Sequence, residues 1–386
     1  TSASEVKVDT TAPTGTISAT PAGPVSGTTT ITGTSTDAVS GVQKVDVKYT
    51  KGATSGDICL APASPTAWSC SWDTSALGDG TYTISLEVTD RATNRETTTI
   101  ARTIVLDNTA PTTSFNSFAE ISGNNFLQAS GSTMYYNPTG SGSFDVLINA
   151  TDAGSGVNRV TFPAPGANWT PAAASDDTTA PSPYEYTYSF TAPSGASPGL
   201  MTTTATDNAA KSANASFTLT KDSTAPAGGS ISYNTAVTNV TSATITLNPG
   251  TDAQAGLNTQ TLERAVATYA NDSCGSYGGF GTLSTSPGTT YTDTTLADGF
   301  CYMYRFTVTD NVDNSVTYTS ASEVKVDTTA PTGTISATPA GPISGTHTFT
   351  GTSSDGVSGV QKVDVKYAKG ATSGNICLAP ASPTAW

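Results

Sequence analysis

Aspartate recurs in this sequence at fixed places within short repeated phrases. The phrase Asp-x-Thr-Ala-Pro occurs four times, beginning at Asp9, Asp107, Asp222 and Asp327. Carboxylates are preferred ligands of hard cations such as Ca²⁺. They also accept backbone N–H bonds in turns and cap those turns without any metal. The repeated Asp therefore allows two interpretations, a metal ligand and a turn cap.

Two further Asp-containing phrases recur in a constant order after each Asp-x-Thr-Ala-Pro phrase. The first reads TDAVSGV at 36–42, TDAGSGV at 151–157, TDAQAGL at 251–257 and SDGVSGV at 354–360. The second reads TDRATN at 89–94, TDNAAK at 206–211 and TDNVDN at 309–314. Together they supply seven more candidate carboxylates, which are Asp37, Asp152, Asp252, Asp355, Asp90, Asp207 and Asp310.

The segments that must position these residues have the alternation of β-strands. In Thr81–Thr89, the apolar residues Tyr82, Ile84, Leu86 and Val88 alternate with polar ones, which is typical of a half-buried strand. The best candidate for a helix, Leu262–Tyr269, fits a strand equally well, and we predict an all-β fold. Further strands are expected at 28–35, 42–49, 143–150, 184–190, 243–247 and 300–309.

The chain contains a long internal duplication. Residues 1–68 recur as residues 319–386 with differences at seven positions, namely Val25/Ile343, Thr29/His347, Ile31/Phe349, Thr36/Ser354, Ala38/Gly356, Thr50/Ala368 and Asp57/Asn375. Within the period, the Asp-x-Thr-Ala-Pro phrases begin modules of about 100 residues, the size of small β-sandwiches. We expect module 1 at 9–106, module 2 at 107–221, module 3 at 222–326 and the N-terminal part of a second module 1 at 327–386. Residues 1–8 should be the last strand of a preceding module.

These phrases and their order resemble the tandem bacterial Ig-like domains of large surface proteins and adhesins. Module 3, which contains YTDTTLADGFCYMYRFTVTD at 291–310, is closer to fibronectin type III, and Leu296 and Tyr302 resemble the leucine and tyrosine that fix a strand in that fold. The resemblance implies tandem β-sandwiches joined by short Asp-x-Thr-Ala-Pro linkers. The proline restricts φ and holds the preceding residue extended, so each linker should act as a stiff joint.

An Ig-type sandwich would bring the recurring carboxylates together. In that fold the linker and both Asp-containing turns lie at one pole of the module, here called the N-terminal pole. Carboxylates about 5 Å apart repel by roughly 3 kcal/mol per pair at an effective dielectric constant near 20, and bound Ca²⁺ would offset that repulsion. Capping without metal stays an open alternative. The expected sets are Asp9, Asp37 and Asp90, then Asp222, Asp252 and Asp310, and last Asp107, Asp152 and Asp207, where Lys211 could replace a cation; the partial fourth set has Asp327 and Asp355.

The composition argues against nucleic-acid binding and against a membrane-spanning helix. Only 12% of residues are charged and the formal net charge is -14, which argues against nucleic acid because phosphate contacts need clustered Lys and Arg. No segment approaches the roughly 20 apolar residues of a membrane-spanning helix. We therefore expect neither nucleic-acid binding nor a membrane span in this segment.

The five cysteines form two close pairs and one remainder. Cys59 and Cys70 flank a ten-residue loop, and Cys274 and Cys301 flank a Gly-rich region. With no CxxC motif and one histidine in the chain, disulfides in an oxidising compartment are a better interpretation than zinc. Cys377 corresponds to Cys59, and its expected partner, the counterpart of Cys70, lies past residue 386.

Three functional classes remain to be weighed. Catalysis is not expected, because the single histidine, His347, replaces a threonine in the other copy and no nucleophile or phosphate-loop motif occurs. We expect a structural stalk or fibre segment of a bacterial extracellular surface protein, with further copies of these modules, or other chains in a filament, as partners. The alternative is an adhesin or glycan-binding array. Its candidate sugar-stacking residues are Trp68, Trp72, Trp169, Tyr82, Tyr135 and Tyr136.

Overall fold

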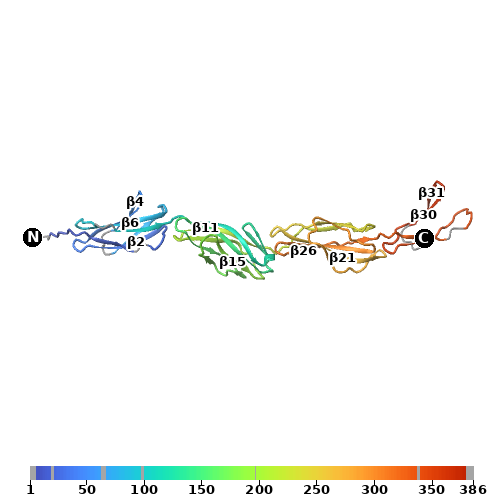
Figure 1. The fold of residues 1–386 in the computed structure, drawn as a ribbon, viewed down its shortest axis with the longest axis horizontal. Coiled ribbons are helices and arrows are strands. Elements are labelled where there is room, and N and C mark those ends of the chain that lie inside the picture. The colour runs from blue at the N-terminus through green and yellow to red at the C-terminus, as the bar shows by residue number, and fades with distance from the viewer. Residues whose placement is uncertain are drawn as a thin grey trace. The chain divides into compact units, whose positions relative to one another are not determined.

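The computed structural model describes residues 6–18, 21–61, 67–96, 100–195, 197–336 and 340–379, with the side chains of 60, 61 and 377–379 excepted. Contacts divide it into two compact units, Thr1–Lys221 and Asp222–Trp386. The ribbon consists of strands joined by loops (Figure 1), and the described residues contain no helix longer than the 3-10 turn at Asn124–Phe126. This confirms the all-β prediction.

Module 1 is a sandwich of two antiparallel sheets. The strand orders are β1-β2-β5 and β4-β3-β6-β7. The predicted alternation is present in β6, where Tyr82, Ile84, Leu86 and Val88 are all buried in one core. The strands are β1 (Thr14–Ile17), β2 (Thr28–Thr36), β3 (Val42–Lys51), β4 (Thr54–Ala61), β5 (Trp68–Asp73), β6 (Gly80–Asp90) and β7 (Ile100–Leu106).

Module 2 is a second sandwich in the same unit, with a core of its own. Its two sheets have the orders β14-β12-β16-β17-β10-β9 and β13-β15-β11-β8. Aromatic rings dominate the core, where Phe144 stacks on Tyr188 and Trp169 meets the edge of Tyr136. The strands are β8 (Thr112–Ser122), β9 (Leu127–Ser130), β10 (Thr133–Tyr136), β11 (Gly142–Thr151), β12 (Val157–Phe162), β13 (Trp169–Thr170), β14 (Ser175–Asp177), β15 (Tyr184–Phe190), β16 (Gly199–Asp207) and β17 (Ser212–Lys221).

Module 3 forms the larger part of the second unit. One sheet has the order β18-β20-β24, and the other runs β19-β27-β25-β21-β22 with β23 and β26 at its sides. Leu262–Tyr269 lies within strand β21, so the strand interpretation is confirmed. The strands are β18 (Ser230–Tyr233), β19 (Val237–Thr238), β20 (Ala243–Asn248), β21 (Leu257–Ala270), β22 (Ser273–Cys274), β23 (Gly281–Ser284), β24 (Thr290–Asp293), β25 (Phe300–Asp310), β26 (Ser315–Thr319) and β27 (Val324–Val326).

The second copy of the module 1 sequence begins the same way as the first. Strand β28 (Thr332–Ile335) pairs with β29 (Gly351–Ser354), as β1 pairs with β2, and β30 (Val363–Lys369) pairs with β31 (Thr372–Ala379), as β3 pairs with β4. The repeated sequence therefore repeats its strand pairing.

Both predicted disulfides are present. Cys59 and Cys70 are bonded with their Cα atoms 5.8 Å apart, and Cys274 and Cys301 are bonded at 5.9 Å. The side chain of Cys377 lies outside the described residues. Each bond joins two segments of one module, and the Cys274–Cys301 pair also belongs to a small cluster with Val357 of the following module.

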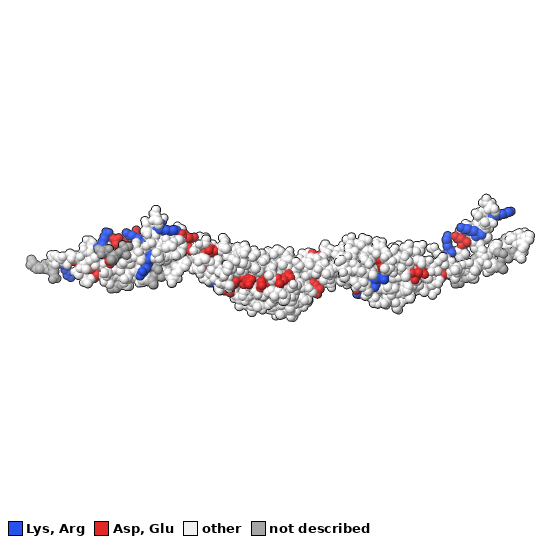
Figure 2. Space-filling model, in the orientation of Figure 1, with Lys and Arg blue, Asp and Glu red and all other residues white. Residues whose placement is uncertain are grey.

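The surface carries few charges. On the face drawn in Figure 2, Lys, Arg, Asp and Glu form small groups on a mostly uncharged surface, as the 12% charged content implies. Among the described residues there is no helix long and apolar enough to cross a membrane.

Candidate functional site

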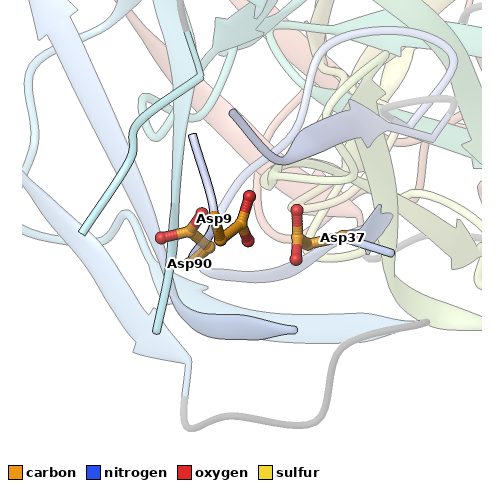
Figure 3. A group of neighbouring side chains, drawn as sticks. All are labelled: Asp9, Asp37 and Asp90. Carbon is orange, nitrogen blue, oxygen red and sulfur yellow. The ribbon is translucent and has the colours of Figure 1, made fainter. Parts of the chain in front are cut away.

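The recurring aspartates meet at the N-terminal pole of each complete module. In each of the three groups, one ligand atom per carboxylate lies within 4.8 Å of the others, and Figure 3 shows the first group. The structure thus brings together all nine residues that the sequence placed in complete sets. The groups are Asp9, Asp37 and Asp90; Asp107, Asp152 and Asp207; and Asp222, Asp252 and Asp310.

The first turn phrase positions one carboxylate of each group through its own backbone. Asp37 Oδ1 accepts N–H bonds from Val39, Ser40 and Gly41 at 2.7–3.1 Å. The turn closes at Gly41, whose φ of +77° is in the left-handed region that glycine adopts without strain. The Gly of this phrase is therefore needed for the turn, and Asp37 acts as its cap.

Module 1 satisfies its carboxylates with an asparagine. The Asn94 side-chain nitrogen donates to Asp90 Oδ2 at 2.7 Å and to the backbone oxygen of Asp9 at 3.1 Å. Asp9 Oδ2 in turn accepts the Ser40 N–H at 2.9 Å. The hydrogen bonds from Ser40 and Thr11 hold the pKa of Asp9 below its usual value, because they favour its charged form.

Module 3 repeats this arrangement. Asn314 donates through its side-chain nitrogen to Asp310 Oδ2 at 2.8 Å, and Asp222 Oδ2 accepts the Ala255 N–H at 3.1 Å. Burial raises the pKa of Asp222, and the charges of Asp252 and Asp310 add to that effect. The cluster is thus hydrogen-bonded but electrostatically crowded.

Module 2 lacks this asparagine, because Lys211 stands four residues after Asp207, where Asn94 follows Asp90. The side chains of Asp107 and Asp207 are 0% and 1% exposed, yet the Oδ2 atom of each has no hydrogen-bond partner. Burial raises the pKa of Asp207, and the charges of Asp107 and Asp152 raise it further. This is the under-satisfied cluster among the three.

Lys211 does not neutralise the module 2 cluster. Its backbone N–H donates to Asp207 Oδ1 at 2.8 Å, but its ammonium makes no ion pair with Asp107, Asp152 or Asp207. Instead the ammonium helps to lower the pKa of Asp79 in module 1. The charge compensation expected from Lys211 is thus not made by an ion pair with these three acids, and the ranking of the three sets stays a prediction.

Glycine at one turn position also distinguishes module 2. Gly154 occupies the place of Val39 in the first turn phrase, and a Cβ there would lie 2.6 Å from the Asp107 carboxyl group. The Asp107 carboxylate therefore rests against the turn, and its Oδ2 lacks the N–H bond that Asp9 Oδ2 receives from Ser40.

The partial fourth set consists of the two expected acids, Asp327 and Asp355. Asp327 Oδ2 accepts the Ser358 N–H at 3.0 Å, and Asp355 Oδ1 accepts N–H bonds from Val357, Ser358 and Gly359 at 2.9–3.2 Å. In the described part of this module these two carboxylates act as turn caps.

The aromatic residues that could have stacked on sugars lie mostly inside the cores. Trp68, Trp72 and Trp169 are 6%, 3% and 5% exposed, and Tyr82 and Tyr136 are buried as well. The sixth candidate, Tyr135 in strand β10, is half-buried. These residues stabilise the sandwiches and do not form an exposed aromatic surface.

Two functional acids escaped the sequence reasoning. Asp79 and Asp298 each precede a glycine just before the long strand of their module, in the segments Leu77–Gly80 and Leu296–Gly299, and each carboxylate bonds to the following linker. The recurrence of Leu-x-Asp-Gly in modules 1 and 3 was the available signal.

Two family profiles match the N-terminal part of the chain. Residues 7–86 match the profile described as a bacterial Ig domain, and residues 66–131 match a bacterial Ig-like domain of group 3. No curated protein matches the sequence.

Solved structures that match the chain include three proteins of low identity. Dimeric latent PorU from Porphyromonas gingivalis is 14% identical over 82% of this chain, with a TM-score of 0.18. The chicken CNTN1 FN1-FN3 domains are 9% identical over 77% of this chain and 98% of that one, with a TM-score of 0.21. A Salmonella alpha-2-macroglobulin mutant is 9% identical over 85% of this chain, with a TM-score of 0.21. This chain spans 34% of PorU and 28% of the alpha-2-macroglobulin, and no argument rests on likeness of this degree.

Proposed function

We propose that this chain, whose residues 7–131 match bacterial Ig-like profiles, is a stalk or fibre segment of a bacterial surface protein, in which the modules provide length and stiffness. Such domains together with disulfides indicate a secreted or extracellular protein. They are generally non-enzymatic modules, and the proposed role requires no catalysis. Further copies of the same modules would be its immediate partners.

The observation that carries this proposal is the near-identical duplication of a whole stretch of modules. Residues 1–68 and 319–386 differ at seven positions, and the described strands of the second copy pair as those of the first. Duplication of a ligand-binding site does not require copying the surrounding sandwich, whereas extension of a stalk does. Since each complete module has its own core, adding modules adds length without rebuilding a fold.

The adhesin alternative has less support. Five of its six candidate stacking residues are buried in cores, where tryptophan and tyrosine contribute apolar area and ring contacts. A sugar would require an exposed aromatic face. We therefore favour the structural role over direct ligand contact by these modules.

A pulling experiment on the full chain tests the stalk proposal. Each complete module should unfold as a separate event, because its core is its own, and each should release roughly 300 Å of chain on the basis of about 3.5 Å per extended residue. The Cys59–Cys70 bond shortens the module 1 step until it is reduced. A single event for a whole unit, or no force peaks, would contradict mechanically independent modules.

We also propose that Ca²⁺ binds the carboxylate cluster of module 2. Two buried carboxylate oxygens without partners, Asp107 Oδ2 and Asp207 Oδ2, are costly unless a cation or a proton compensates for them. Asp107, Asp152 and Asp207 would hold the ion, with water completing a shell of six to eight oxygens. Their Oδ1 atoms are already fixed by backbone N–H groups, so the acids are held in place before an ion arrives.

The clusters of modules 1 and 3 are weaker candidates for a cation. In each, an asparagine side-chain nitrogen donates to the carboxylate oxygen that is free in module 2. That nitrogen also donates to the backbone oxygen of the linker Asp. The two acceptors hold the amide with its nitrogen toward the carboxylates. Ca²⁺ binding there would require the amide to turn over, so we place module 2 first.

A further inference from the structure

Asp79 contacts the linker that leaves module 1. Its Oδ1 accepts the backbone N–H of Asn108 at 2.6 Å, and its Oδ2 accepts the hydroxyl of Thr109. These are the second and third residues of an Asp-x-Thr-Ala-Pro phrase. Both hydrogen bonds lower the pKa of Asp79, and the bond from the Thr109 hydroxyl lowers it more than the bond from the Asn108 N–H. A charged acceptor with two donors on one loop fixes that loop strongly.

Asp298 makes the same pair of contacts at the end of module 3. The N–H of Thr328 donates to Oδ1 at 2.6 Å, and the hydroxyl of Thr329 donates to Oδ2 at 2.7 Å. The same two bonds lower the pKa of Asp298. Independent recurrence in two modules of different sequence indicates a selected contact and not an accident of one loop.

The loop that carries each of these carboxylates is itself held in place. In module 1 the Tyr82 hydroxyl donates to the Gly78 backbone oxygen at 2.8 Å, and in module 3 the Ala297 N–H donates to the Tyr302 hydroxyl at 2.7 Å. Both tyrosines are buried in their cores. The carboxylate therefore transmits the position of the preceding core to the linker.

The linker is bonded forward as well as backward. Asp107, the first residue of the phrase, belongs to the carboxylate cluster of module 2, while Asn108 and Thr109 bond to Asp79 of module 1. Three consecutive residues thus connect two cores. A further bond joins the same modules, from the Ser26 hydroxyl to the Ala209 backbone oxygen at 2.7 Å.

The end of module 2 is built differently. Pro198, which has no acceptor in its side chain, stands before Gly199 at the place that Asp79 takes before Gly80. The neighbouring Ser197 hydroxyl bonds within the module, accepting the Lys221 N–H at 3.2 Å and donating to the Leu219 oxygen at 2.8 Å. Module 2 therefore has no carboxylate at the position where modules 1 and 3 have Asp79 and Asp298.

Strand register at the end of module 2 also differs. In module 1, Gly80 pairs with Leu106 and the linker Asp107 follows directly. In module 2, Gly199 pairs with Leu219, and Thr220 and Lys221 continue the strand along β10 before Asp222. The linker of module 2 thus starts two residues beyond the loop that would have to hold it.

We propose that Asp79 and Asp298 are latches, each of which fixes the linker that follows its module and thereby the next module. The proposal rests on the stalk function and deepens it by naming residues that stiffen the stalk.

The test measures distance distributions in the full chain by pulsed electron resonance, with spin labels carried on unnatural amino acids so that the cysteines stay intact. The label pair, at the exposed positions Thr32 and Ser216, spans the joint that Asp79 latches. We expect a narrow distribution for this pair. A broad distribution in the unsubstituted protein would overturn the proposal.

Variants separate the latch from general stability. Asp79→Ala and Thr109→Val should each broaden this distribution. Asp73→Ala is the matched control, because the Asp73 carboxylate bonds to Ser75 within its own turn. If Asp79→Ala failed to fold, Thr109→Val, which keeps the shape of the side chain, would decide alone; an unchanged narrow distribution in a folded variant would refute the latch.

The latch and the stalk proposals can fail separately. A narrow distribution that persists in Asp79→Ala would remove the latch while leaving independent modules in the pulling experiment. Loss of separate unfolding events would remove the stalk argument whatever the joint widths are.

Discussion

The hydroxyl of Thr109 bonds to the carboxylate of Asp79, which lies 30 residues earlier in the chain. Asp107, two residues before that threonine, belongs to a carboxylate group with Asp152 and Asp207. At this joint, the Asp of the repeated phrase belongs to the following module and its Thr bonds to the preceding one, as Thr329 bonds to Asp298. Proline then restricts the backbone at the end of the phrase. The recurring Asp, Thr and Pro thus each have a physical role in joining two sandwiches.

Replacing Lys211 with asparagine should weaken Ca²⁺ binding by module 2. The new amide would donate to Asp207 Oδ2, as Asn94 does to Asp90 Oδ2, and an ion would have to displace it. We expect calorimetric titration of the full chain to show affinity reduced by roughly tenfold or more, which corresponds to about 1.4 kcal/mol. Hydrogen exchange would locate the stabilised residues in module 2.

The reciprocal variant, Asn94→Lys, serves as the matched comparison. It removes the donor to Asp90 Oδ2 and should create in module 1 the unpaired oxygen found in module 2. A gain of Ca²⁺ protection in module 1 is expected. If Lys211→Asn bound Ca²⁺ as tightly as the unsubstituted chain, the ion would not depend on the free oxygens, and the acids would be turn caps.

Stability of Ca²⁺-free module 2 should fall as the pH rises. Burial raises the pKa of Asp207 above its ordinary value of 3.8, and the neighbouring Asp107 and Asp152 carboxylates raise it further. A carboxyl group with a raised folded pKa stabilises the fold fully below the unfolded pKa, and that contribution is lost as the pH rises through the folded value. Asp207→Asn, which cannot titrate, should lack this loss and be the more stable protein at neutral pH.

Hydrogen exchange of both proteins in chelator across the acidic range checks this expectation. Equal stability of the two proteins at every pH would mean that the cluster is neutral or already compensated without an ion.

Removing the disulfides should destabilise modules 1 and 3 separately. Chain entropy predicts a loss of roughly 3 kcal/mol for a loop of the size closed by Cys59–Cys70, and about 0.5–1 kcal/mol more for the longer loop of Cys274–Cys301. Paired alanine substitutions followed by thermal melting measure both losses. A lower melting temperature for module 2 in either variant would show that the modules are not independent.

Most of the fold was predictable because its signals are local. Period-2 alternation fixed the strand at 81–89, which is strand β6 at Gly80–Asp90. The close spacing of the cysteines gave both disulfides. The convergence of Asp9, Asp37 and Asp90 followed from the resemblance to Ig-like domains, because that topology places the linker and both turns at one pole.

Whether the carboxylates of a cluster all have hydrogen-bond partners depends on side-chain contacts that cannot be read from the sequence. The sequence shows that residue 94 is Asn and residue 211 is Lys. Whether either side chain points toward its cluster depends on packing. Asn94 reaches Asp90 Oδ2, whereas the Lys211 ammonium lies where it lowers the pKa of Asp79. The latches were missed for a similar reason, since Asp79 and Thr109 meet only after two modules have folded.

Small-angle scattering of the full chain in solution tests the central claim most directly. A module whose strands have about ten residues is roughly 35 Å long, and end-to-end modules that provide length should give a maximum dimension of 100 Å or more for three of them, by the same estimate of about 35 Å each. The stalk account predicts that extended form. A maximum dimension near that of a compact globule of the same mass would contradict it.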